Sequence, residues 1–176
     1  MNTCTPIPPP QDAPVRRVPA QPLPPYRYVP GLNPHPFRHE GGHMYTDGSA
    51  PEEAPWDPNT DWHTDPRFLY AADLFDHRFY WEAHEAWEAL WHSAEPHSST
   101  HRLLQSLIQY AASVLQHHKG SASGAQRLYQ RATERLAQVQ QDETDLFRGI
   151  HLSELSARVD SFLKGGPWPL LPMERS

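Results

Sequence analysis

The sequence predicts an all-α protein: a small up-and-down bundle of four to six helices with a proline-rich N-terminal extension. Apolar residues recur at helical spacing over several long segments, and no segment shows the alternation of a strand. Of the 20 prolines, 15 lie within the first 60 residues. Because proline lacks an amide donor and fixes φ, that stretch cannot be a helix or a central strand. The 176 residues suffice for one domain of ordinary size plus an extension.

The proline-rich part divides into two segments. Residues 1–22 are predicted to form a disordered tail. From Leu23 onward, prolines alternate with tyrosines and aliphatic residues, so residues 23–64 are predicted to be an extended segment that is ordered by docking on the bundle. The helical domain is then expected over residues 65–165, followed by a C-terminal tail over residues 166–176.

The first two helices are predicted from their boundaries. Asp65 is suited to an N-cap and Pro66 to the first helical position, so a helix begins there. A short break at residues 76–78 separates it from a second helix over about 79–91, which stops before Pro96.

Three more helices are expected. The third begins near Ser99 and closes at residues 117–120, where basic residues complement the helix dipole and a glycine ends the helix. The fourth spans about 122–140, and the fifth opens at Ser153 and ends at residues 165–167. Short connections predict that neighbouring helices pack antiparallel.

Composition excludes several classes of function. A formal net charge of −6 argues against a dedicated nucleic-acid binder, and Arg127, Arg131 and Arg135, four residues apart, are interpreted as a solvated helix face. No apolar stretch approaches the roughly 20 residues needed to span a bilayer, and the start lacks the features of a signal peptide, so no membrane partner and no export are expected. The single Cys4 excludes an internal disulfide, which fits a cytoplasmic location.

The second helix carries the residues that indicate chemistry. From Trp81 to Trp91 it contains one histidine, three glutamates and three tryptophans. At about 100° per residue, His84, Glu85 and Glu88 share an arc of roughly 100° with Trp81. A helix that only buried one side would place the glutamates on the other side, so the pattern predicts a functional site or a satisfied buried polar network.

One hypothesis is a metal-dependent hydrolase. His84 and Glu88 can offer a ring nitrogen and a carboxylate to one divalent cation (zinc, manganese or iron), while Glu85 acts as the base that deprotonates a water. The pattern H-E-x-x-E differs from the zinc protease motif H-E-x-x-H in its last residue. Because two protein ligands do not hold a catalytic metal, a third is expected from the docked segment, either His35 or His43.

The alternative is a helical module that is not an enzyme and that binds a small molecule, a peptide or a second copy of itself. In this interpretation the three polar residues of the second helix bond to tryptophan N–H groups and to Gln105 and Gln109. Those glutamines can equally orient a substrate. Trp81 is a candidate stacking surface, although aromatic residues at helical spacing usually form core.

Two sequence runs, from Phe79 to Trp91 and from Leu104 to Ala112, resemble the family catalogued as domain of unknown function three-zero-nine. The resemblance covers roughly residues 65 to 165. It implies a small helical bundle that carries the label predicted metal-dependent hydrolase, with no established substrate. Ser106 departs from the glycine that is common in the second run. The residues that match the characteristic polar positions of the family are His84, Glu85, Glu88, Gln105 and Gln109.

Overall fold

A computed structural model describes residues 5–47 and 54–174; Cys4, named above, lies outside the described residues. The predicted small helical bundle is confirmed, with five helices and one short hairpin in the described chain. Its elements are α1 (Pro66–Asp76), α2 (Tyr80–Trp91), α3 (Ser99–His118), α4 (Ala122–Asp142), β1 (Leu146–Phe147), β2 (Ile150–His151) and α5 (Leu152–Leu163).

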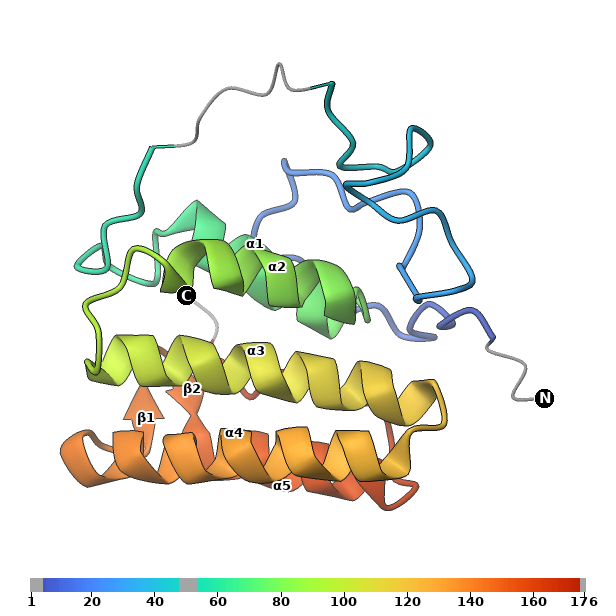
Figure 1. Ribbon diagram of the computed structural model, residues 1–176. Helices are drawn as coiled ribbons and strands as arrows, with labels where there is room; N and C mark the ends of the chain where they lie inside the picture. The colour runs from blue at the N-terminus through green and yellow to red at the C-terminus, as the bar shows by residue number, and fades with distance from the viewer. Residues whose placement is uncertain (1–4, 48–53, 175–176) are drawn as a thin grey trace.

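Helix α3 lies at the centre of the bundle. Figure 1 shows α1 and α2 above it and α4 and α5 below it, and α3 packs against both α2 and α4. A helix with neighbours on two sides must bury two sides, and Leu104 and Ser113, which lie about 180° apart around α3, are both fully buried. Neighbouring helices in the sequence therefore pack side by side, as short connections require.

The predicted boundaries of α1 and α2 are confirmed. The carboxylate of Asp65 accepts hydrogen bonds from the amides of Arg67 at 3.0 Å and Phe68 at 3.2 Å, which satisfies two amides that the first turn leaves open. The break at residues 76–78 contains Arg78, whose φ of 66° is incompatible with a continuing helix. This break allows α2 to fold back beside α1.

The hairpin was not predicted. Strands β1 and β2 pair antiparallel, with Phe147 opposite Ile150, through a turn in which Arg148 and Gly149 have φ values of 47° and 74°. Two residues per strand are too few to show an alternating pattern. The start of α5 also differs slightly: it begins at Leu152, and Ser153 instead bonds through its amide and hydroxyl to Asp145.

The structure differs from the predicted disorder at residues 5–22. Ile7 is only 4% exposed, and the amides of Arg17 and Val18 each donate to the Asp73 carboxylate at 2.9 Å. Asp73, on α1, is completely buried, and a buried carboxylate requires donors. Proline-rich composition indicates the absence of regular secondary structure, but it does not exclude tertiary contacts of this kind.

The next part of the N-terminal segment, up to residue 47, runs over the outer side of α2 (Figure 1). Val29 is fully buried there and Tyr28 is almost fully buried. The residues after α5 also pack on the bundle: Leu171 is buried, and its amide donates to Asp76 at 2.6 Å. None of the described helices combines the length and the hydropathy that crossing a membrane requires.

Candidate functional site

Helix α2 presents two different faces. Tyr80, Ala83, Trp87 and Leu90 are buried and face the bundle core. The opposite face, which meets the N-terminal segment, carries half-buried polar residues and Trp81. The predicted cluster of histidine and glutamates therefore lies at the edge of the bundle, between α2 and the N-terminal segment, and not in the bundle interior.

Three of these polar residues converge. One ligand atom each from His84, Glu85 and Glu88 lies within 4.8 Å of the other two. The closest recorded approach is 3.2 Å between His84 Nδ1 and Glu85 Oε1. The two side chains are about one quarter exposed, at 27% and 25%, so the cluster is partly shielded from water but open to a solute. A histidine nitrogen with two carboxylates is a donor set that divalent transition metals accept.

The two histidines predicted as third ligands do not join this group. The His35 ring packs against Tyr28 and Trp81, with ring centroids 5.3 and 5.7 Å away, and its Nδ1 accepts from the amide of Phe37. His43 lies beside a different glutamate, described below. Sequence reasoning placed both histidines in the right segment, but a segment without regular structure gives no periodicity from which side-chain direction follows.

The glutamines of the second motif are held by another residue. From α4, Arg135 donates through Nε to Gln105 Oε1 at 2.7 Å and through Nη1 to Gln109 Oε1 at 3.1 Å. Over the described residues, the indole N–H groups of Trp87 and Trp91 have no hydrogen-bond acceptor. The non-enzymatic interpretation expects hydrogen bonds from the polar cluster to these glutamines and tryptophans. Those hydrogen bonds are not formed among the described residues.

Trp81 packs against the N-terminal segment. Its ring lies 5.0 Å from Tyr28 in an edge-on arrangement and 5.7 Å from Phe37, in addition to its contact with His35. Aromatic pairs at these separations stabilise the fold beyond the area that they bury. The role that these contacts support is to anchor the segment over α2.

Glu82 is a site residue that sequence reasoning missed. Its side chain is only 2% exposed; Oε1 accepts from the amide of Tyr28 at 2.9 Å and lies 3.5 Å from His43 Nε2. Burial raises the pKa of Glu82 to about 7, against the opposing effects of the Tyr28 amide and the positive charge of Arg27. The available signal was its position three residues before Glu85, which places both on one side of the helix.

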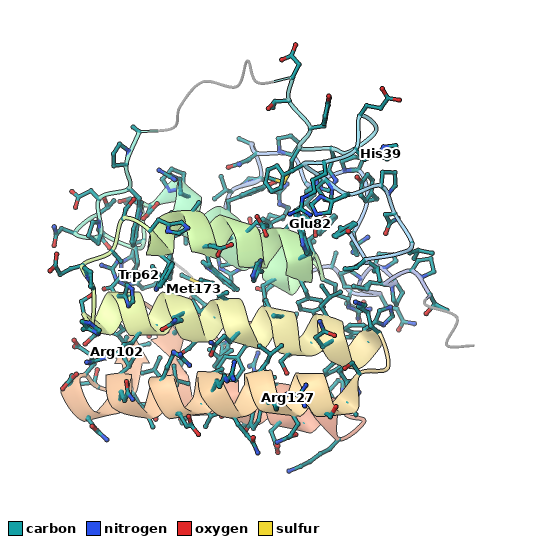
Figure 2. All side chains as sticks on the ribbon, viewed as in Figure 1. His39, Trp62, Glu82, Arg102, Arg127 and Met173 are labelled. Atoms are coloured by element: carbon teal, nitrogen blue, oxygen red, sulfur yellow. The ribbon has the colours of Figure 1, made fainter. Side chains whose placement is uncertain are left out.

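A groove of about 740 Å³ runs between α2 and the N-terminal segment. Figure 2 shows Glu82 on the side of α2 that faces this segment. The groove is within the size range of small-molecule sites, and His84 does not line it. Its α2 wall consists of Glu82, Glu85, Ala86, Glu88, Ala89, Leu90 and the adjoining His92.

One family model matches the region of the chain that contains this cluster. No curated protein and no solved structure matches the chain. The model of the family described as Domain of unknown function (DUF309) matches residues 68–128, which include most of α1, all of α2 and α3, and the first turns of α4. The resemblance drawn from the two sequence runs is confirmed over residues 68–128, where the chain is similar to the DUF309 family model.

Proposed function

We propose that the protein is a metal-dependent hydrolase whose divalent cation is held by the cluster on α2. The observation that carries the proposal is the convergence of ligand atoms from His84, Glu85 and Glu88 to within 4.8 Å of one another. The three residues follow the H-E-x-x-E pattern, and successive positions one and four residues apart lie on neighbouring parts of one helical face.

The chemistry of the donors fits such an ion. His84 Nδ1 is buried and has no hydrogen-bond partner among the residues that the structure describes. A ring nitrogen from His84 and a carboxylate oxygen from Glu88 are donors that suit zinc, manganese or iron(II). When bound, the cation would polarise an ester, amide or phosphoester oxygen and acidify a water.

The three residues have distinct proposed roles. His84 and Glu88 are the ligands on α2; because neither His35 nor His43 joins them, water would complete the coordination of the cation. Glu85 lies beside His84 and also lines the groove, so it is placed to take a proton from water on the groove side. Glu85 and Glu88 together connect the cluster to the groove, which is where a substrate would lie.

Metal binding is tested first. Protein dialysed against EDTA is titrated separately with Zn²⁺, Mn²⁺ and Fe²⁺, by calorimetry and by thermal unfolding. A cation at about 100 times its Kd stabilises the folded state by about 2.7 kcal/mol, which raises Tm by about 5 to 10 °C in a chain of this size. His84→Ala and Glu88→Gln are expected to abolish this rise, and the exposed Glu134→Gln is the control. If none of the three metals raises Tm, the proposal is wrong.

Catalysis is tested with p-nitrophenyl acetate, p-nitrophenyl phosphate and alanine p-nitroanilide, in the presence of the metal that binds. Glu85→Gln separates two roles, because a base can be removed without losing the cation. Retained metal with hydrolysis reduced at least a hundredfold supports the role of base. Loss of the metal itself assigns Glu85 as a third ligand and contradicts the proposed role.

A further inference from the structure

The groove between α2 and the N-terminal segment has a strongly acidic wall. Glu82, Glu85 and Glu88 all line it. Its one arginine, Arg67, donates to the carbonyl of Ala54 at 2.9 Å and is therefore engaged at the edge of the groove. A hollow with three carboxylates on one wall and few cations concentrates positively charged solutes.

A glutamate on the wall of this groove has a buried acceptor atom that receives no hydrogen bond. The side chain of Glu82 is only 2% exposed, and its Oε1 accepts a hydrogen bond from the amide of Tyr28. The other oxygen, Oε2, has no hydrogen-bond partner within residues 5–47 and 54–174. Leaving a buried carboxylate oxygen without a donor is costly, so a ligand that supplies a donor there gains free energy.

His43 adds a second open polar group. Its side chain is 5% exposed, and neither ring nitrogen has a hydrogen-bond partner in the described chain. The ring is held edge-on against Tyr26, with centroids 4.5 Å apart, and its Nε2 lies 3.5 Å from Glu82 Oε1. A neutral imidazole offers one acceptor nitrogen, so Glu82 and His43 together can receive two of the three N–H groups of an ammonium.

Most of the remaining lining is apolar, and its polar members are Gln21, Tyr70 and His92. Leu23 and Pro24 face the groove from the N-terminal segment, Leu74 from α1, and Ala86 and Ala89 from α2. These side chains provide contacts for methylene groups but no donors for an anion. The combination of an apolar trough with a buried acidic end selects an alkyl chain that ends in a positive charge.

We propose that this groove binds a small primary alkylammonium ion, with the ammonium at Glu82 and His43 and the alkyl chain along Leu23, Leu74 and Ala86. The site goes beyond the proposed metal centre and does not depend on it. Its acceptors are Glu82 and His43, which are not proposed ligands of the cation.

The probe is hexylammonium chloride, titrated at pH 8 into full-length protein with EDTA present, so that failure of the metal proposal does not affect the outcome. Binding is followed by calorimetry and by the amide NMR signal of Tyr28, because that amide donates to Glu82. We expect saturable binding with a shift of the Tyr28 signal. The neutral 1-hexanol, which keeps the alkyl chain, should bind at least tenfold more weakly.

Two variants test the assignment, with Glu134→Gln as the control for the loss of an exposed charge. Glu82→Gln keeps the acceptor for the Tyr28 amide and should weaken hexylammonium at least tenfold. Ala89→Phe fills the groove from an exposed position and should do the same, which decides the matter if Glu82→Gln does not fold. Equal affinity for hexanol, unchanged affinity in either folded variant, or no binding of hexylammonium overturns the proposal.

Discussion

The guanidinium of Arg17 donates to the buried carboxylate of Asp76 at 2.8 Å, across 59 positions of sequence. The same Nη1 atom lies 3.2 Å from Oδ1 of Asp73, which is completely buried. Two carboxylates on one side of α1 are thereby compensated by a residue of the proline-rich segment. Burying them without a cation would cost several kcal/mol for each carboxylate.

Removing this cation should strongly destabilise the fold. Arg17→Ala leaves Asp76 buried without its positive partner and leaves Asp73 with Arg16 alone, whose Nε lies 3.6 Å from Oδ2. Loss of one member of a buried ion pair costs about 3 to 5 kcal/mol. The free energy of unfolding in urea measures the effect. Arg127→Ala, at an exposed position of α4, is the control and should change it by less than about 0.5 kcal/mol. A change below 1 kcal/mol for Arg17→Ala would show that the pair is not buried in solution.

Glu82 should make stability fall as pH rises. Its folded pKa of about 7 lies above the usual value of 4.5, so the folded state holds a proton that the unfolded state has lost between these pH values. The contribution of Glu82 to the free energy of unfolding is therefore highest below pH 4.5. It decreases by roughly 3 kcal/mol as the pH rises to 7. With EDTA present, the difference in unfolding free energy between Glu82→Gln and wild type should move by that amount in favour of the variant.

The matched variant for this pH series is Glu134→Gln. Glu134 is exposed, so the same chemical change should give a difference from wild type that is nearly independent of pH. A flat difference for Glu82→Gln as well would mean that Glu82 is solvated in the folded protein.

Gly149 should tolerate no side chain. Its φ is 74°, and a Cβ atom there would overlap the ring of Trp62. Gly31 has a similar φ of 87° but open space around it, so Gly31→Ala measures the backbone cost alone, about 1 kcal/mol. Gly149→Ala should cost at least about 1 kcal/mol more, because the tryptophan must move. Equal losses of Tm in the two variants would contradict the close packing of the hairpin turn on Trp62.

Arg135 should support structure and leave the metal cluster unchanged. Arg135→Met keeps the aliphatic stem but removes the donors to Gln105 and Gln109, which should cost about 1 to 2 kcal/mol of unfolding free energy. The affinity for the metal, where one binds, should stay within twofold of wild type. A tenfold loss of metal affinity would instead place the glutamines in the support of the site.

The sequence was informative wherever local chemistry determines structure. Asp65 and Pro66 predicted the start of α1 because capping and a fixed φ act within one turn, and the periodicity of the apolar residues predicted the helical bundle. The cluster of His84, Glu85 and Glu88 was also predictable, since its members belong to one helix whose geometry is regular.

What could not be predicted depends on long-range contacts. The placement of His43 beside Glu82 follows from the path of a segment without periodicity. The ion pair between Arg17 and the buried aspartates joins distant parts of the chain, and the apolar periodicity of α1 gives no sign that Asp73 is buried. The structural network expected around Gln105 was wrong in its partner, because Arg135 looked like part of a solvated face.

Asp76 receives hydrogen bonds from both end segments of the described chain: Arg17 binds one of its oxygens and the Leu171 amide binds the other. The two segments therefore meet at a single side chain, although nearly the whole bundle separates them in sequence. Removing either segment takes a donor from the same buried carboxylate, so the losses of unfolding free energy caused by the two truncations should not be additive.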